Sequence, residues 1–190
     1  MTAPDPDVVS RAVHGDAAAV SRLLAEIRPK VVRYSLAHLS RTDGGSSAAE
    51  DIAQDVCIAV LRALPTFADQ GRPFIAFVYR IAARKVADAY RAAQRNRAYS
   101  VAEVPDAPDP APGPESQVLA AEMAARLDFL LAQLPATHRE ILVLRLAVGM
   151  TAREVGTVLD MSAGAVRLAQ HRALTRLRAL AGDTLAEVIL

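Results

Sequence analysis

The sequence contains no tryptophan, and aromatic residues make up only 4% of its 190 positions. Sandwiches and barrels of β-strands are rich in aromatic and β-branched residues, so this composition argues against both. Alanine, leucine and arginine dominate instead, and all three favour helices. Because 52% of the residues are hydrophobic, the chain can form a core, which argues against global disorder. We therefore expect an all-α fold with one ordinary domain or two small ones.

Cysteine is nearly absent as well, since Cys57 is the only one. A single cysteine excludes an intrachain disulfide framework and fits a reducing compartment. No apolar run approaches the ~20 residues that a membrane-spanning helix requires. Residues 1–7 contain Pro and Asp where a signal peptide would carry basic and then apolar residues. We expect a soluble, cytoplasmic protein without membrane insertion.

Side-chain groups typical of an enzyme are scarce too. The four histidines are scattered and have no carboxylate or cysteine partners at ligand spacing: His14, His38, His138 and His171. The sequence shows no glycine-rich phosphate loop and no Ser or Cys nucleophile motif, and no metal site follows from its spacings. We predict no catalytic residues, no metal and no cofactor.

The sequence has little net charge, because 22 basic and 21 acidic residues nearly balance and leave a net charge of +1. The charges are nevertheless segregated. Residues 71–97 hold seven basic residues and one acidic residue, a net charge of +6. Residues 98–135 hold one basic and six acidic residues, a net charge of −5. Such segregation suggests an anionic partner that is contacted at specific places.

The clearest boundary in the chain is SVAEVPDAPDPAPGPE, residues 100–115. Five prolines fix φ and remove backbone donors, so neither a helix nor a sheet can continue through this segment. Its four acidic residues, without a basic one, favour an extended and solvated linker. We therefore predict two helical domains, residues 1–97 and 115–190, joined by an acidic, Pro-rich linker over residues 98–114. We expect each domain to bury its own core.

Helical spacing of apolar residues runs through almost all of the remaining chain. Asp16 is a candidate N-cap, and Pro29 fits the first turn of a new helix. The predicted helices cover residues 17–27, 30–39, 48–64, 74–96, 115–133, 136–148, 152–159 and 163–181. We find no internal repeat and no strand pattern.

The segment MTAREVGTVLDMSAGAVRLAQHRALTRLRAL, residues 150–180, carries the most specific pattern. Thr151 can cap a short helix, a turn follows at residues 160–162, and Ser162 can cap a longer helix with an outward basic row. A short helix, a tight turn and a longer helix are typical of a helix-turn-helix, whose second helix lies in a DNA major groove.

The second of these helices offers several side chains to DNA. Arg167 could pair bidentately with guanine, and Leu168 could contact a thymine methyl. Arg172 and Arg176 lie further along and suit phosphates, and His171 is a candidate for a phosphate contact or for packing. The alternative, a plain helical hairpin with solvated arginines, stays open for this segment taken alone.

The stretch RPFIAFVYRIAARKVADAYRAAQRNR, residues 72–97, combines basic residues with several of the few aromatic ones. Cations that follow a backbone and rings that take unstacked bases suit single-stranded nucleic acid. The alternative is an aromatic core with a solvated charged face, and it is favoured for Phe74, Phe77 and Tyr79. For Phe67, in a loop near Gly71, both interpretations stay open.

The segment AEDIAQDVCIAVLRAL, residues 49–64, has two faces when it is drawn as a helix. The apolar face contains Ile52, Val56, Cys57, Val60, Leu61 and Leu64. The other face contains Asp51, Gln54, Asp55, Ile58 and Arg62, and its two acids, amide and apolar residue could dock onto another protein. Taken alone, this second face is better explained as solvated, and Cys57 as a packing residue.

These three segments, in this order, resemble the extracytoplasmic-function group of the bacterial sigma-70 family, and most of all the actinobacterial sigma-D subgroup. The resemblance rests on AEDIAQDVCIAVLRALPTF, PFIAFVYRIAARKVADAYRAAQR and LPATHREILVLRLAVGMTAREVGTVLDMSAGAVRLAQHRALTRL. It implies an alternative sigma factor that binds core RNA polymerase and directs promoter-specific transcription initiation. Residues 1–97 would be sigma region 2, and residues 115–190 would be sigma region 4 with its helix-turn-helix.

The resemblance also implies partners and site residues. Core polymerase would be bound through its β′ clamp and its β flap, with Asp51, Gln54 and Asp55 on the clamp. The −10 element, opened to a single strand, would contact Phe67, Arg80, Arg84, Lys85, Asp88 and Arg91. The −35 element, as duplex DNA, would contact Ser162, Ala163, Arg167, Leu168, His171, Arg172 and Arg176. An anti-sigma factor would control the protein.

Further implications concern the opened DNA. A base flipped from the non-template strand would enter a pocket formed by Phe67, Arg84 and Asp88. The linker would lie near the polymerase active-site channel and the RNA exit path. Three positions depart from the family pattern: Phe77 replaces a usual Trp, Arg84 replaces a frequent Asn, and Leu168-Ala169 replaces a common Ser-Arg pair. The promoter consensus is therefore left open.

Two other classes of protein account for less of the sequence. A stand-alone helix-turn-helix regulator would explain residues 115–190 but neither the acidic helix face nor the basic, aromatic helix. A helical adaptor without a nucleic-acid partner would leave the helix-turn-helix unexplained as well.

Overall fold

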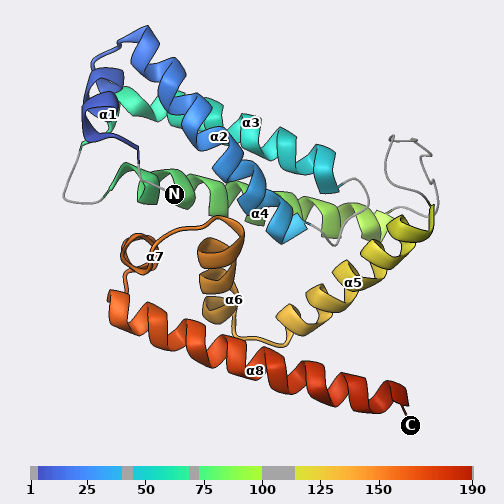
Figure 1. Cartoon of the computed structure of the whole chain (residues 1–190). Helices are drawn as coiled ribbons and strands as arrows, with labels where there is room; N and C mark the ends of the chain where they lie inside the picture. The colour runs from blue at the N-terminus through green and yellow to red at the C-terminus, as the bar shows by residue number, and fades with distance from the viewer. Residues whose placement is uncertain (1–3, 40–44, 69–72, 100–113, 190) are drawn as a thin grey trace.

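The computed structural model describes residues 4–39, 45–68, 73–99 and 114–189, and every regular element in these ranges is helical (Figure 1). The α-helices are α1 (Pro6–Val13), α2 (Ala17–Leu39), α3 (Gly45–Ala63), α4 (Phe74–Tyr99), α5 (Pro114–Ala132), α6 (Ala136–Leu142), α7 (Ala152–Leu159) and α8 (Ala163–Ile189). A 3-10 turn, η1 (Leu64–Thr66), follows α3, and a π-helical turn, η2 (Val143–Ala147), follows α6. The predicted all-α fold is confirmed. None of the helices in these ranges has the length and hydropathy of a membrane span.

Helices α1 to α4 form the N-terminal half, in which α2, α3 and α4 pack on one another (Figure 1). The contact faces are aliphatic and fully buried, with Leu23, Ile27 and Val31 on α2, Val56 and Val60 on α3, and Val78 and Ala82 on α4. These residues recur every three or four positions, which places them on one side of each helix. The opposite side of α3 is thereby left to solvent, whereas α4 also packs on α7.

Helix α1 lies outside the predicted set. The carboxylate of Asp5 caps it by accepting a hydrogen bond from the amide of Asp7 at 3.0 Å, and Pro6 occupies its first position. Both are start signals that the sequence contains. Eight residues are too few for a stable isolated helix. Burial of Val8 and Val9 against α2 and η1 therefore holds α1 in place.

The predicted break before Pro29 is wrong, because α2 continues through this residue. Proline removes one helical hydrogen bond and leaves the carbonyl of Ala25 without its usual donor. Ala25 and Pro29 are both exposed, so water can reach that carbonyl. On the buried side of the helix, Ile27 and Val31 are inaccessible to solvent, and their packing keeps the two halves of α2 in line.

Helices α7 and α8 have the predicted helix-turn-helix arrangement. A capping box starts α7: the amide of Glu154 donates to Thr151 Oγ1 at 3.3 Å, and the Glu154 carboxylate accepts from the Thr151 amide at 2.7 Å. Asp160 ends α7 in the left-handed region, with φ of 59°. The hydroxyl of Ser162 then caps α8 by accepting from the amide of Ala165 at 3.1 Å.

The turn between these helices brings two backbone segments together at Gly156. Its carbonyl accepts a hydrogen bond from the amide of Met161 at 2.8 Å. A Cβ atom on residue 156 would overlap the carbonyl oxygen of Met161. Only glycine therefore permits α8 to leave α7 at this distance.

The helix predicted over residues 136–148 is α-helical only to Leu142 and then widens into η2. Arg145 lies in this wider turn. Its Nε atom donates to Oε1 of Gln170 at 2.9 Å, and its guanidinium also contacts the carbonyl of Met150. These contacts tie η2 to α8.

One continuous apolar core joins the two halves of the chain, which differs from the expectation of two separate cores. Ile141, Leu144 and Val155 of the C-terminal half are fully buried in the same cluster as Tyr79 of α4. Helix α7 packs on α4, and η2 packs on α2. Because α6 and α7 are short, they have too little surface to bury all their apolar residues against α8, and the remainder pack on the N-terminal half.

Gly156→Ala tests the close approach within the helix-turn-helix. Because the added methyl would meet backbone rather than a flexible side chain, we expect the free energy of unfolding to fall by about 1–3 kcal/mol. Urea denaturation measures this change. Gly164→Ala is the control, since a Cβ there meets only Oγ of Ser162 at 3.8 Å and should leave stability unchanged or slightly raised. Equal effects of the two variants would contradict the role given to Gly156.

Candidate functional site

The acidic face of α3 consists of Asp51, Gln54 and Asp55, all of which are exposed. Ile52 on the same helix is buried, so α3 presents these three polar residues outward as predicted. The carboxylate of Asp55 accepts a hydrogen bond from Nζ of Lys85 on α4 at 2.8 Å. An exposed pair of this kind contributes at most about 1 kcal/mol. Either residue is therefore free to exchange this contact for one with a partner.

An apolar groove of about 370 Å³ adjoins the acidic face. It is lined by Leu24, Ala25, Arg28, Gln54, Cys57, Ile58 and Leu61. Ile58 and Leu61 are 38% and 45% exposed. The prediction that Leu61 faces the core is therefore wrong, because none of the helices that the structure describes covers it on the groove side. Burial raises the pKa of the Cys57 thiol, which fits the predicted packing role rather than a reactive thiolate.

The basic face of α4 is formed by Arg80, Arg84 and Arg91, which are all exposed. Two more residues predicted to contact the single strand have partners within the chain. Asp88 accepts a hydrogen bond from Nη2 of Arg91 at 2.5 Å, and Lys85 turns toward α3. The basic face thus borders the acidic face along one side of α4.

Three phenylalanines cluster at the start of α4. The ring centroid of Phe67 lies 5.2 Å from that of Phe74 and 5.2 Å from that of Phe77. Phe74 is only 6% exposed, as the core interpretation predicts. Phe67 and Phe77 are half-buried, so these two rings pack in the cluster and also reach the surface.

A cavity of about 260 Å³ opens beside this cluster. Phe67, Phe77 and Arg80 contribute to its lining, and Thr157 of α7 contributes from the other half of the chain. The structure therefore brings Phe67 together with Arg80. Arg84 and Asp88, which were grouped with Phe67 in the predicted base pocket, do not line this cavity.

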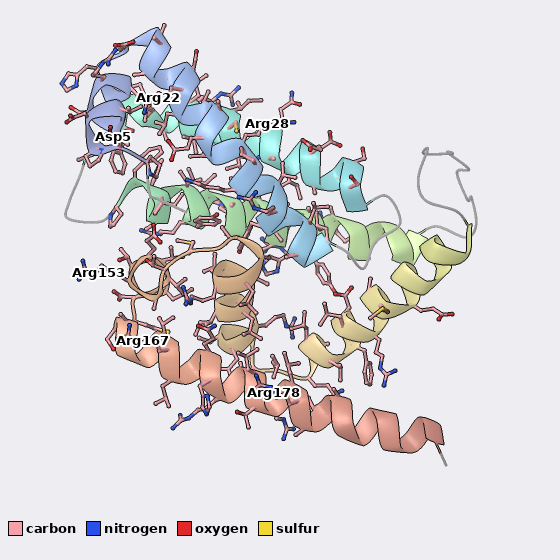
Figure 2. All side chains as sticks on the ribbon, in the orientation of Figure 1. Asp5, Arg22, Arg28, Arg153, Arg167 and Arg178 are labelled. Atoms are coloured by element: carbon pink, nitrogen blue, oxygen red, sulfur yellow. The ribbon has the colours of Figure 1, made fainter. Side chains whose placement is uncertain are left out.

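Helix α8 buries Val166 and Ala173 completely, and the predicted DNA-binding side chains lie on its outer surface. Arg167, Leu168, His171, Arg172 and Arg176 are all exposed, whereas Ala163 is half-buried and the Ser162 hydroxyl is engaged in the helix cap. Figure 2 shows Arg167 near the start of α8, with Arg153 on α7 and Arg178 further along α8. Arg153 and Arg178 are exposed as well. The sequence analysis did not include Arg153 and Arg178 among the DNA-binding candidates, although their location in the predicted helix-turn-helix could have indicated them.

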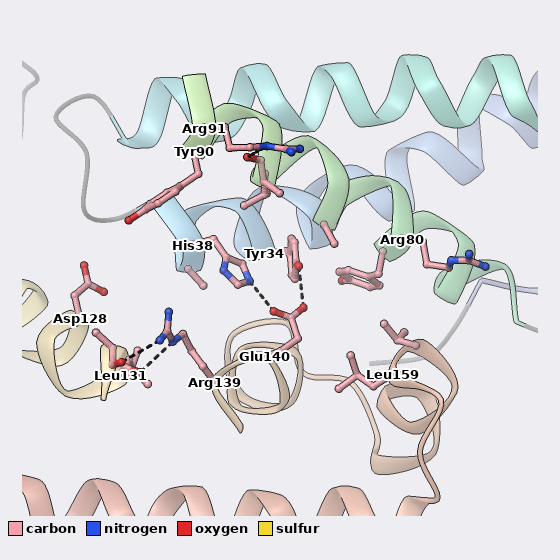
Figure 3. A pocket seen from close by; sticks show the side chains of 17 residues that line it. Tyr34, His38, Arg80, Tyr90, Arg91, Asp128, Leu131, Arg139, Glu140 and Leu159 are labelled. Atoms are coloured by element: carbon pink, nitrogen blue, oxygen red, sulfur yellow. Dashed lines mark hydrogen bonds and ion pairs between the residues drawn. The ribbon is translucent and has the colours of Figure 1, made fainter. Parts of the chain in front are cut away.

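A polar contact joins the two halves of the chain at Glu140 (Figure 3). The Tyr34 hydroxyl donates to Oε1 of Glu140 at 2.8 Å. Nε2 of His38 lies 3.1 Å from Oε2, which makes an ion pair when the imidazole is protonated. Burial and the adjacent carboxylate both raise the pKa of Tyr34, so its hydroxyl keeps its proton and remains a donor.

A second tyrosine at this junction differs from Tyr34 in its hydrogen bonding. Tyr79 is 1% exposed, and its ring centroid lies 5.3 Å from that of Tyr34. Its buried hydroxyl makes no hydrogen bond within the part of the chain that the structure describes. Burial raises the pKa of this hydroxyl, and the neighbouring Glu154 of α7 adds to the shift, although Arg33 opposes it. An unsatisfied buried hydroxyl costs about 1–3 kcal/mol.

Comparison with known proteins agrees with this geometry. The family profile for Sigma-70 region 2 matches residues 23–96, and that for Sigma-70, region 4 matches residues 130–179. The chain is 53% identical over 178 residues to the ECF RNA polymerase sigma factor ShbA of Streptomyces griseus, covering 92% of this chain and 93% of ShbA. The chain belongs to the extracytoplasmic-function (ECF) sigma factors of the sigma-70 family. It is therefore an alternative sigma factor that acts in promoter-specific transcription initiation.

Other relatives of this sigma factor support the same assignment. It is 48% identical over 171 residues to the ECF RNA polymerase sigma factor SigD of Mycobacterium tuberculosis, covering 90% of this chain and 81% of SigD. The predicted resemblance to the sigma-D subgroup is thus confirmed. The solved structure of CnrH in complex with the cytosolic domain of CnrY covers 93% of this chain and 96% of CnrH, with a TM-score of 0.66 and 26% identity.

The region assignments show that the contact at Glu140 connects region 2 with region 4. Tyr34, His38 and Tyr79 fall within the region 2 match, whereas Glu140 falls within the region 4 match. None of these four residues was predicted to have a role in function. Tyr34 and Glu140 are 106 positions apart, and no spacing in the sequence links them. Only the folded arrangement of the two regions brings them together.

Proposed function

We propose that this sigma factor binds core RNA polymerase through region 2, reads a single-stranded −10 element with region 2 and reads a duplex −35 element with region 4. The observation that carries the proposal is the presence of both sigma regions in one chain, each with an exposed charged face of the required kind. The function is one of binding, with no catalytic residue, metal or cofactor assigned to the chain. It places the protein in the cytoplasm, where polymerase and promoters are found.

The acidic face of α3 is the proposed contact for the coiled-coil clamp of the polymerase β′ subunit. Its two carboxylates and one amide suit a basic and polar partner surface. The adjoining groove supplies apolar area at Ile58 and Leu61, and interfaces commonly combine such a centre with a polar rim. Region 4 is the proposed partner of the β flap.

The basic face of α4 and the phenylalanine cluster are the proposed contacts for the −10 element. Arginines at this face would follow the phosphates, and Phe67 would stack on an unpaired base. Flipping a base costs a few kcal/mol, so melting requires a pocket that holds it. The cavity beside Phe67 and Arg80 suits this role better than a pocket that also includes Arg84 and Asp88.

The outer surface of α8 is the proposed contact for the −35 element. Arg167 lies in the first turns of the helix, where base edges are read, and Leu168 could contact a thymine methyl. Arg172, Arg176 and the additional Arg178 lie further along and suit phosphates.

Control by an anti-sigma factor is the last part of the proposal. CnrH, which has the same fold and 26% identity, was solved with the cytosolic domain of CnrY bound to it. A protein that covered either the acidic face of α3 or the outer surface of α8 would block an essential contact. The signal would then come from that partner.

Run-off transcription tests the proposal. We expect core RNA polymerase from the same organism to produce specific transcripts from genomic promoter fragments only when this protein is added. Polymerase alone and protein alone are the controls. If the pair activates no fragment while the protein alone protects duplex DNA from nuclease, the chain is a stand-alone helix-turn-helix regulator instead.

Asp51→Ala combined with Asp55→Ala tests the polymerase contact. We expect affinity for core polymerase to fall by at least about 2 kcal/mol, measured by fluorescence titration, with little change in melting temperature because both side chains are exposed. Asp7→Ala, an exposed aspartate on α1, is the control and should bind normally. Unchanged affinity of the double variant would mean that the interface with core polymerase lies elsewhere on the protein.

Arg167→Ala tests the reading of the −35 element. We expect a loss of about 1–3 kcal/mol that is confined to one base pair of the element, measured by binding of the holoenzyme to a series of single-base promoter variants. Arg172→Ala should instead weaken binding to all of them equally, since a phosphate contact carries no sequence information. A uniform loss for Arg167→Ala would make that residue a phosphate contact too.

A further inference from the structure

Tyr90 on α4 is an exposed aromatic residue that the proposed function does not use. It is 40% exposed, whereas Tyr34 and Tyr79 are 2% and 1% exposed and belong to the core. Within the part of the chain that the structure describes, Tyr90 makes no hydrogen bond and no ring contact. Figure 3 shows its side chain projecting from α4 without a dashed line to a neighbour. The ring therefore contributes little to the packing of the fold.

Tyr90 lies directly beside the basic face of α4. The arginines of that face recur at spacings of four and seven residues, so they share one side of the helix. Tyr90 follows Ala83 and Ala87 at spacings of seven and three, which places these three residues in a second row next to the arginines. Both alanines are exposed. Because their side chains are short, the row is open along its length up to the ring of Tyr90.

A cavity of about 770 Å³ gives access to this row. Tyr90, Arg91 and the two alanines line it from α4, and α5 contributes Asp128 and Leu131. Its volume lies within the range of about 300–1,000 Å³ that is usual for sites of small ligands. A nucleobase therefore has room to lie against the ring of Tyr90.

An exposed ring next to a row of cations suits single-stranded rather than duplex DNA. The cations follow the phosphates, and an unpaired base stacks on the ring. The bases of a duplex are stacked on one another and cannot use the ring in this way. Phe67 offers a half-buried ring beside the opposite end of the basic face. Since α4 rises by 1.5 Å per residue, about 20 Å of helix separate the phenylalanine cluster at Phe77 from Tyr90.

We propose that Tyr90 is a second stacking residue for the opened −10 strand. One base enters the cavity beside Phe67, and another base, further along the same strand, stacks on Tyr90. The inference rests on the proposed function, because it takes the basic face of α4 as the −10 contact. Two stacking points that lie far apart on α4 fix the register of the strand along the helix. Every base has a face that can stack, so Tyr90 sets the position of the strand rather than the identity of a base.

Binding of a fluorescent, mixed-sequence 12-nucleotide DNA single strand to the full-length protein tests the contact. Tyr90→Ala should weaken binding by at least about fivefold, because one stacked base is lost. Tyr90→Phe keeps the ring and should bind like the wild type. Phe129→Ala removes an exposed ring of α5 and should also bind normally. Unchanged affinity of Tyr90→Ala would overturn the inference, and an equal loss in Tyr90→Phe would show that the hydroxyl, not stacking, makes the contact.

The lack of tryptophan in the chain permits a spectroscopic test as well. Tyr90→Trp introduces a single indole that can still stack, and its emission should be quenched when the 12-nucleotide strand binds. Phe129→Trp places an equally unique indole at a position that is 61% exposed, and its emission should not change. Absence of quenching in Tyr90→Trp, or equal quenching in both variants, would contradict stacking at Tyr90.

Photocrosslinking in the holoenzyme decides the question whatever the affinity of the free protein. A promoter fragment that yields a run-off transcript carries 5-iodouracil at one position at a time in the non-template strand of its −10 element. We expect one position to crosslink to the tryptic peptide of residues 86–91, which contains Tyr90, and a different position to crosslink near Phe67. The first crosslink should be lost in Tyr90→Ala.

The outcomes of this experiment separate the two proposals. If transcripts form but no position crosslinks to residues 86–91, the role of Tyr90 is overturned and the proposed function stands. If no promoter fragment yields a transcript, the proposed function is refuted instead, and the affinity and quenching of the free protein decide whether Tyr90 stacks on a single strand.

Discussion

The packing of α7 against α4 is the contact on which the arrangement of the chain depends. Val155 enters the core that also contains Tyr79, so the first helix of the helix-turn-helix is anchored in region 2. The capping box at Thr151 and the close approach at Gly156 fix where α7 begins and how α8 leaves it. The orientation of α8 relative to α4 therefore depends on this apolar contact and on one glycine.

The charged pairs differ from one another in how far they are exposed to solvent. The pairs between Lys85 and Asp55 and between Arg91 and Asp88 are exposed, and they hold surface side chains that a partner can readily recruit. The pairing at Glu140 is half-buried, with side-chain exposures of 19% for His38 and 23% for Glu140, and it joins the two regions. The exposed charges are thus available to other molecules, whereas the half-buried carboxylate makes its contacts within the chain.

Much of the fold could be predicted from the sequence because it depends on local signals. The boundaries of α7 follow from the cap at Thr151 and the turn after Leu159, and the exposure of Arg167 follows from helical periodicity. Two local features gave wrong or missing predictions. Pro29 lies inside a helix because the tertiary packing of α2 outweighs the loss of one hydrogen bond, and α1 depends on contacts with residues far along the chain.

Only those parts of the candidate site that depend on local signals could be predicted from the sequence. Faces of single helices, such as that of Asp51 and Gln54, follow from residue spacing alone. The cavities do not follow from residue spacing, because Phe67, Arg80 and Thr157 come together only after three helices have packed. Periodicity within one helix carries no information about the angle at which another helix crosses it.

Neighbouring residues on α6 connect it in opposite directions. Glu140 reaches back to α2, while Nε of Arg139 donates to the carbonyl of Leu131 at 3.0 Å and Nη2 to that of Ala132 at 3.2 Å, at the end of α5. If the first connection breaks, the second still binds α5 to α6. Helix α6 therefore keeps α5, which begins at Pro114, attached to region 4.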